Sequence, residues 1–123
     1  MSNGSKSYIY GIKDRKNDKF IYIGQTKRNE PKKRMNEHFK DIEHKTHKIK
    51  KLNEYKVEDL DFIILQKLNT DNSLLLSFAE CLWNSKLKPL NRCVIQGFKG
   101  TVTLARCDKN IADKLINEIK EIV

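Results

Sequence analysis

The chain has few of the residues that mark several large classes of protein. Only 2 of its 123 residues are proline and 5 are glycine, which excludes collagen-like and linker-like chains. No apolar run approaches the roughly 20 residues of a membrane-spanning helix, and residues 1–7 lack the apolar centre of a secretory signal. We therefore expect one domain with its own core and no membrane partner.

Cysteine is scarce as well, because the chain has only 3, at positions 81, 93 and 107. The odd number argues against a disulfide framework, and the spacing lacks the short Cys and His pairs of a zinc site. We expect reduced thiols in a cytoplasmic, reducing compartment. A bridge between Cys93 and Cys107 is left open.

Acidic residues are outnumbered by basic ones. The chain has 25 Lys and Arg against 16 Asp and Glu, which gives a formal net charge of +9. Such an excess favours a polyanion as partner, with nucleic acid the first candidate. The alternative is a solvated lysine surface that only aids solubility, since Lys outnumbers Arg 20 to 5 and is spread along the chain.

Two segments rich in aromatic and β-branched residues, 8–13 and 20–25, flank a polar stretch. This pattern predicts a β-hairpin. With the turn centred near Lys16, Tyr10 lies directly opposite Tyr22, and opposed residues project from the same face of a sheet. The two phenols are therefore expected side by side.

The middle of the chain alternates between helical and extended patterns. Pro31 predicts a helix from 31 to about 44, with an inward stripe at Met35, Phe39 and Ile42. A short helix is expected over 47–54. The nearly continuous apolar run at 61–68 is typical of a buried central strand.

The C-terminal half predicts a further helix over 74–86, with Ser73 as N-cap and Pro89 beyond its end. A short hairpin over 93–104 and a final helix capped by Asp108 follow, and the apolar stripe of that helix comprises Ile111, Leu115, Ile119 and Ile122. The fold class is α/β (α+β), a small antiparallel three-stranded sheet flanked by helices. We expect a flexible tail at 1–7, a core at 8–92 and a C-terminal extension of the same domain at 93–123.

Glu80 stands out among the charged residues. Leu76, Trp83 and Leu87 lie at −4, +3 and +7 from it, so the carboxylate projects on the apolar side of its helix. A lone buried carboxylate is costly unless it is paired or bound to a metal ion. A salt bridge to lysine, an interhelical hydrogen bond and exposure at the helix edge are the structural alternatives.

Five short pieces of sequence resemble one family when taken in order. Tyr8-Ile9-Tyr10 and Tyr22-Ile23-Gly24 resemble the paired motifs that name the GIY-YIG nuclease family, although Tyr8 stands at the first glycine. Gln25-Thr26, then Arg34 and His38 as Arg-x-x-x-His, then a Glu80 helix that leads to Pro89-x-Asn91, continue the pattern. The resemblance spans residues 8–91.

The chain is most similar to the catalytic heads of phage-type homing endonucleases, notably in His38-Phe39-Lys40-Asp41 and the later His47. This resemblance implies the interior of a phage-infected or bacterial cell as the setting. The part from Cys93 onwards has no counterpart. Target recognition through a protein partner or a homodimer is left open.

The resemblance implies a metal-dependent endonuclease that hydrolyses DNA phosphodiester bonds. Glu80 would hold one Mg²⁺, or Mn²⁺ in its place, Tyr10 would orient and deprotonate the attacking water, and His38 would take or relay the proton. The implied catalytic residues are Tyr10, Tyr22, Arg34, His38, Glu80 and Asn91. The implied DNA contacts are Lys13, Lys19, Lys27, Arg28, Lys33 and His47.

Each of these residues also has an ordinary structural interpretation. Tyr10 and Tyr22 form a cross-strand aromatic pair, Arg34 and His38 a solvated helix flank, and Asn91 a helix-stop residue. A non-catalytic nucleic-acid-binding module on the same fold is the alternative function. The final helix either docks a partner or closes the core, and we prefer core closure.

Overall fold

Three antiparallel strands in the order β2-β1-β3 form the centre of the computed structural model, which describes residues 6–27, 30–97 and 99–122. They are β1 (Ser7–Asp14), β2 (Lys19–Lys27) and β3 (Leu60–Leu68). Ser7, assigned to the tail by the sequence, is buried and already belongs to β1. The predicted fold class, a small antiparallel sheet with helices, is confirmed.

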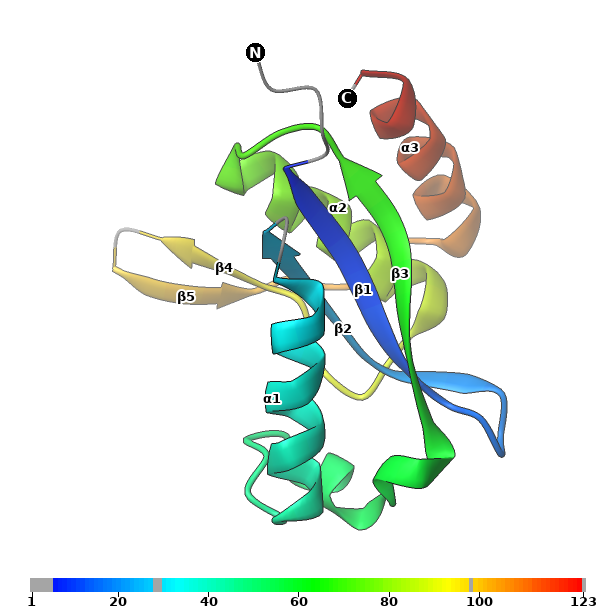
Figure 1. Cartoon of the computed structure of the whole chain (residues 1–123). Coiled ribbons are helices and arrows are strands. Elements are labelled where there is room, and N and C mark those ends of the chain that lie inside the picture. Colours follow the sequence, from blue (N-terminus) through cyan, green and yellow to red (C-terminus); the bar gives the residue numbers. More distant parts are fainter. Residues whose placement is uncertain (1–5, 28–29, 98, 123) are drawn as a thin grey trace.

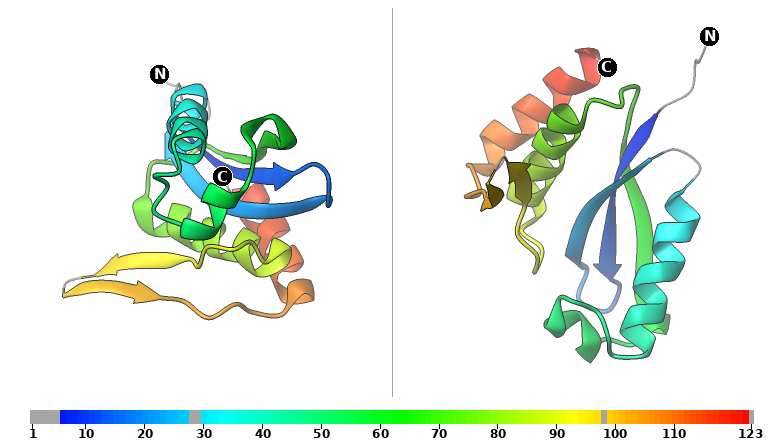
Figure 2. Two further views of the ribbon diagram at one scale, coloured as in Figure 1. Left: turned by 90° about the horizontal axis from the view of Figure 1, so that it is seen from below. Right: turned by 90° about the vertical axis from the view of Figure 1, so that its left-hand side faces the viewer.

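Helices cover both faces of this sheet, as the right-hand view of Figure 2 shows. α1 (Pro31–Glu43) lies on one face, and α2 (Ser73–Leu87) with α3 (Lys109–Ile122) lies on the other. Two short 3₁₀ helices, η1 (Lys50–Glu54) and η2 (Val57–Asp59), lead from α1 to β3. Neighbouring residues of β1 alternate between the two covered faces, so Ile9 and Tyr10 are both fully buried.

The register of the first hairpin differs from the predicted one. Tyr10 pairs with Gly24 and Tyr22 with Ile12, so the two tyrosines are not directly opposed. The turn is centred half a residue later than predicted, and β2 carries one extra residue at a bulge opposite Ile12/Lys13. These two changes slip the pairing by two residues, which keeps both phenols on one face.

The apolar run at 61–68 was expected to be the central strand, and this is wrong. β3 lies at the edge and pairs only with β1, within the described part of the chain. The apolar character of β3 reflects the helices on both faces of the sheet rather than strands on both sides. As expected for an edge strand, β3 is not buried throughout, since Ile64 is 37% exposed.

The helix termini differ from the expected ones in detail. Asn72, not Ser73, caps α2, since its side chain accepts a hydrogen bond from the Leu75 N–H. Asp108 does cap α3. Ile111 is 53% exposed instead of inward, while Ala112, Ile116 and Ile119 pack into the core against α2. α3 therefore closes the core, as preferred.

The predicted C-terminal hairpin is present as β4 (Val94–Gly97) and β5 (Gly100–Thr103), which form a separate two-stranded sheet. The expectation of three reduced cysteines is wrong, because Cys81 and Cys93 form a disulfide and only Cys107 is free. The turn after α2 brings Cys93 back beside the helix, with the two Cα atoms 5.3 Å apart. Among the described helices, none is both long enough and apolar enough to cross a membrane.

Candidate active site at the free edge of β2

The two motif tyrosines lie under α1, with their ring centroids 6.2 Å apart. Tyr10 is fully buried and Tyr22 nearly so. Gly24, across the ladder from Tyr10, makes room for the phenol: a Cβ there would lie 2.7 Å from Tyr10 Oη. Glycine is needed at this position because of close approach rather than an unusual backbone angle.

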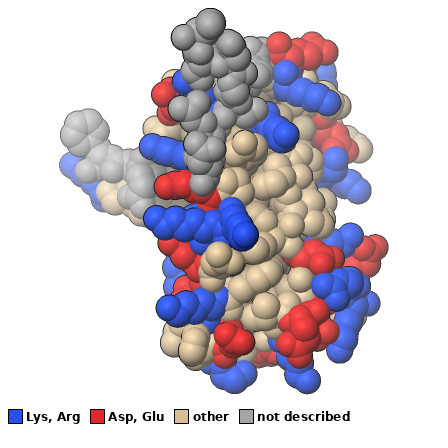
Figure 3. Space-filling model, in the orientation of Figure 1, with Lys and Arg blue, Asp and Glu red and all other residues tan. Residues whose placement is uncertain are grey.

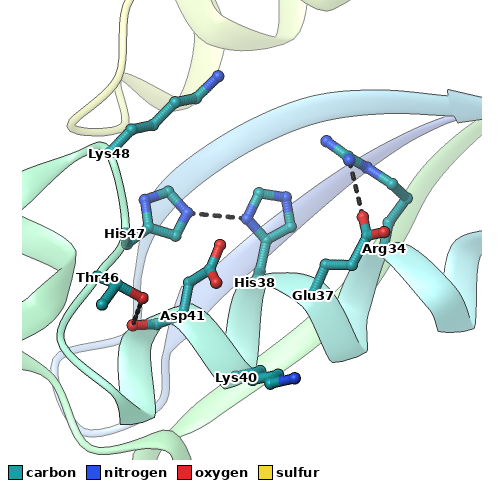
Figure 4. A pocket seen from close by; sticks show the side chains of 8 residues that line it. All are labelled: Arg34, Glu37, His38, Lys40, Asp41, Thr46, His47 and Lys48. Atoms are coloured by element: carbon teal, nitrogen blue, oxygen red, sulfur yellow. Dashed lines mark hydrogen bonds and ion pairs between the residues drawn. The ribbon is translucent and has the colours of Figure 1, made fainter.

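His38 of α1 and His47 connect these tyrosines to the loop after the helix. His38 Nε2 lies 2.6 Å from Tyr10 Oη, and His38 Nδ1 lies 2.9 Å from His47 Nε2. Figure 4 shows the two imidazoles turned towards each other beside Arg34 and Lys48. His38 and His47 are both buried.

The network determines which ring nitrogen carries each proton. The Ile49 backbone N–H donates to His47 Nδ1 over 3.0 Å, so a neutral His47 carries its proton on Nε2. That proton is donated to His38 Nδ1, which leaves the proton of His38 on Nε2. His38 therefore donates to Tyr10 Oη, and Tyr10 is the acceptor.

Asn53 of η1 fixes the backbone at His47. Its Oδ1 accepts from the His47 N–H at 2.9 Å, and its Nδ2 donates to the His47 carbonyl at 3.1 Å. A paired amide contact of this kind replaces the strand partner that this loop lacks. The orientation of His38 thus depends on a chain of contacts that reaches to Asn53.

Burial controls the protonation of these groups. It raises the pKa of Tyr10 strongly, with the Tyr22 phenol adding to the rise and the charge of nearby Arg34 opposing it. Burial also raises the pKa of Tyr22, with the Glu80 charge adding to it. It lowers the pKa of His38 to about 3, assisted by His47 and by the charge of Arg34. Both phenols and His38 are therefore uncharged at neutral pH.

Glu80 approaches from the opposite layer, on α2, beside the free edge of β2. Burial raises the pKa of its carboxyl to about 7, opposed by a hydrogen bond from Gln25 and by the charge of Lys48. Within the described residues it makes no salt bridge. Its charge adds to the rise in the pKa of both phenols, and the carboxylate itself lines a separate groove with Gln25, Val94 and Ile95.

Glu80 offers a metal ion a single carboxylate rather than a protein cage, and the carboxylates of Glu37 and Asp41 line the separate hollow beside the histidines. No group of three or more His, Cys, Asp or Glu side chains with metal-binding geometry occurs in the described ranges. A half-buried carboxylate without a cationic contact fits a divalent cation, because the cation would offset the cost of burial. Mg²⁺ accepts one or two carboxylates, with water and phosphate oxygens in the other positions.

Basic and acidic side chains together line the hollow beside the histidines, which encloses about 520 Å³: Arg34, Lys40 and Lys48 with Glu37 and Asp41. Arg34 lies in its wall and is paired with Glu37 on the next turn of α1, with 2.9 Å between nitrogen and oxygen. Lys48 extends over the hollow (Figure 4). Lys48, Gln25 and Asn53 were not among the predicted site residues; Gln25 follows the second motif directly, but Lys48 is one of 20 lysines.

Asn91 is the one predicted catalytic residue whose side chain is committed elsewhere. Its Oδ1 accepts from the Ile23 N–H at 3.0 Å and its Nδ2 donates to the Ile23 carbonyl at 2.9 Å. Asn84 in turn donates to the Asn91 carbonyl. Asn91 therefore joins the end of the α2 region to β2, between the two strand positions Tyr22 and Gly24.

The predicted DNA contacts do not form one patch. Lys19 and Lys27 are exposed at opposite ends of β2, and Lys13 pairs with Asp18 at the turn of the hairpin. Lys33 is exposed on α1, His47 is buried, and Arg28 lies outside the described residues. On the face in Figure 3, basic and acidic side chains surround an uncharged band.

Comparison with known proteins identifies a family for most of the chain. Residues 6–98 match the family model described as the GIY-YIG catalytic domain. The matched range contains every residue of the site and stops within the β4–β5 hairpin. No curated protein and no solved structure gives a significant match to the chain.

Proposed function

The chain belongs to the GIY-YIG nuclease family, and from this premise we propose that it is an endonuclease that hydrolyses DNA phosphodiester bonds. The observation that supports the proposal is the contact of two phenols with an imidazole beside a guanidinium. A carboxylate that makes no salt bridge among the described residues lies near enough to raise the pKa of both phenols. The net charge of +9 suits a polyanionic substrate. Kinship with phage-type homing enzymes and a cytoplasmic location stay predictions.

In this proposal Tyr10 first loses its phenol proton to solvent. The phenolate then orients the attacking water and receives a proton from it as the new P–O bond forms, while the bond to the 3′ oxygen breaks and that oxygen takes a proton from solvent. The His38 Nε2–H favours the deprotonated form of Tyr10, since it donates to the phenol oxygen. Because burial raises the pKa of Tyr10 in the free protein, this role requires added positive charge when the substrate is bound. Tyr22 contacts the water or the phosphate.

Arg34 holds a non-bridging phosphate oxygen, for which its planar fork of donors is suited. Its pairing with Glu37 leaves it half-exposed and facing the hollow. Lys48 contributes a second positive charge over the same hollow. Both cations offset the charge that develops on the phosphate in the transition state.

Glu80 is the residue that would hold Mg²⁺ or Mn²⁺. A bound divalent cation supplies charge neutralisation at the phosphate and Lewis acidity. Gln25, whose Nε2 donates to Ser77 Oγ at 3.4 Å, lines the same groove as Glu80 and opposes the rise in the pKa of its carboxyl. We assign positioning roles to His47, Asn53 and Asn91, since their side chains hold His38, the His47 backbone and β2 through hydrogen bonds.

The direct test titrates Mg²⁺ and Mn²⁺ against supercoiled plasmid, branched DNA and RNA, with the intact chain and its Glu80→Gln variant. We expect metal-dependent cleavage of at least one DNA substrate and none by the variant. Salt-sensitive binding without turnover in the intact chain identifies the non-catalytic module instead. Equal cleavage by both proteins contradicts the role of Glu80, and cleavage of RNA alone contradicts the substrate.

A further inference from the structure

The β4–β5 hairpin stands apart from the nuclease core. Its two strands pair only with each other among the described residues, and all four residues of β5 are exposed. Figures 1 and 2 show the hairpin projecting from the body of the molecule. An extension of this shape buries little surface of its own, so its position must come from its base.

The base of the hairpin is fixed to α2 at two points, and a third bond joins the two ends of the hairpin to each other. Cys93 is disulfide-bonded to Cys81, which is the residue after Glu80. The Leu104 N–H donates to the Cys93 carbonyl at 2.9 Å, which closes the base. Arg106 Nε then donates to Asn84 Oδ1 at 2.9 Å. The direction of the hairpin is therefore tied to the helix that carries Glu80.

A groove connects the hairpin to the candidate active site. Val94 and Ile95 line it together with Gln25 and Glu80, and it encloses about 400 Å³. A strand whose phosphate lies at Glu80 would therefore leave the site along the base of the hairpin.

The segment that runs from the end of α2 through the hairpin carries charge of one sign only. From residue 81 to residue 107 the chain has no acidic residue and five basic ones. Arg92 at the base and Lys99 towards the tip are exposed. Thr101 and Thr103 of β5 add exposed hydroxyl groups, and Val94 and Val102 add exposed apolar surface.

We propose that the β4–β5 hairpin is a DNA-binding arm, which lies along duplex DNA on one side of the bond to be cut. A two-stranded antiparallel ribbon fits the major groove, where hydroxyl groups bond to base edges and apolar groups contact thymine methyls. Arg92 and Lys99 contact the flanking phosphates. The inference rests on the proposed function, and it assigns a role to a hairpin whose second strand lies beyond the range of the family match.

The test measures DNA affinity separately from cleavage. Fluorescence anisotropy with a labelled duplex, on the Glu80→Gln background, compares Arg92→Glu/Lys99→Glu with Lys114→Glu/Lys120→Glu. The second pair changes the net charge equally but lies on exposed positions of α3, away from the hairpin (Figure 1). The arm variant is expected to raise Kd about tenfold or more and to reduce the salt slope by about 2, one for each cation. The control pair shifts Kd much less.

Equal Kd values and salt slopes for the two variants overturn the arm. Thermal melting of both variants confirms folding, because all four changed side chains are exposed. A second copy of the chain is the competing occupant. If Val102→Lys turns a dimer into a monomer in gel filtration and leaves Kd unchanged, the hairpin is a dimer contact.

The outcome for the arm is distinguishable from that of the proposed function. Plasmid cleavage that persists with wild-type affinity in the arm variant contradicts the arm alone. Arm-dependent binding without any cleavage by the intact chain contradicts the nuclease proposal alone.

Discussion

His38 Nε2 donates a hydrogen bond to Tyr10 Oη across 2.6 Å in the interior of the protein. The direction of this bond follows from the Ile49 N–H, which fixes the tautomer of His47 and through it that of His38. The hydroxyl hydrogen of Tyr10 is therefore free to point elsewhere. His38 in this tautomer stabilises a deprotonated Tyr10 but has no free lone pair at Nε2 to receive its proton.

The tautomers of both histidines are directly measurable. Long-range ¹H–¹⁵N NMR of the imidazole nitrogens is expected to show the Nε2–H form for His38 and His47. Because the pKa of His38 is lowered to about 3, its ring is expected to stay neutral between pH 5 and pH 8, and the pH–rate profile has no imidazolium limb in that range. A charged or Nδ1–H ring at His38 contradicts the network.

Removal of His47 tests its positioning role. His47→Ala frees His38 Nδ1, so the ring is no longer held in one tautomer, and we expect cleavage to slow about 10- to 100-fold. DNA affinity stays the same, because His47 is buried. His44→Ala is the matched control, since His44 is exposed at the end of α1. If Kd rises while the rate of bound complexes is unchanged, His47 contacts DNA, as the sequence suggested.

The carboxyl of Glu80 makes stability depend on pH. Its pKa rises from 4.5 to about 7 on folding, so the folded state binds the proton more tightly than the unfolded state. The contribution of Glu80 to stability is therefore full below about pH 4.5 and is lost as pH rises from there through about 7. Urea unfolding at pH 5 and pH 8 is expected to show a loss of about 1–3 kcal/mol that Glu80→Gln removes.

Metal binding by Glu80 is tested by thermal melting. Mn²⁺ at pH 8 is expected to raise the melting temperature of the wild-type chain but not that of Glu80→Gln, since the cation replaces the proton on the carboxylate. Glu118→Gln, at an exposed position of α3, is the control. An equal Mn²⁺ effect on all three proteins places the cation elsewhere.

Asn91 is expected to act through the structure rather than through the reaction. Asn91→Ala leaves the N–H and C=O of Ile23 without partners in a buried position. The free energy of unfolding should fall by about 1–3 kcal/mol. Asn117→Ala is the control, because Asn117 is exposed on the outer side of α3, and this change should alter the free energy of unfolding little. An inactive Asn91→Ala protein of wild-type stability would instead assign Asn91 to the chemistry.

Gly24 tests how closely Tyr10 is confined. An alanine Cβ would approach Tyr10 Oη to 2.7 Å and Tyr10 Cζ to 2.8 Å, so the phenol must move. Gly24→Ala is expected to lower kcat at least about tenfold with little change in KM, because binding does not depend on Tyr10. A variant with wild-type kcat shows that the position of Tyr10 is not critical.

Local patterns predicted the shared face of Tyr10 and Tyr22 even though the register was wrong. A slip of two residues preserves the alternation of strand side chains, whereas a slip of one would have separated the phenols. The apolar run of β3 shows the opposite case. Apolar residues report that both faces of a strand are covered, and they carry no information about its neighbours in the sheet.

Contacts between distant segments were beyond the sequence. The partners of Asn91 lie 68 residues away, and the disulfide depends on how the chain turns after α2. Lys48 and Asn53 have no local feature that separates them from other polar residues of the same loop. The family resemblance pointed to His38 and His47 separately, and only the fold showed that the two imidazoles contact each other.

The central claim is that Tyr10 and Glu80 act as one catalytic unit. Single-turnover cleavage of plasmid DNA with saturating Mg²⁺ tests it, with the wild-type chain, Tyr10→Phe, Glu80→Gln and the double variant. The account predicts a loss of about 100-fold or more in each single variant and no further loss in the double variant. Losses that multiply in the double variant, or wild-type rates in either single variant, would contradict it.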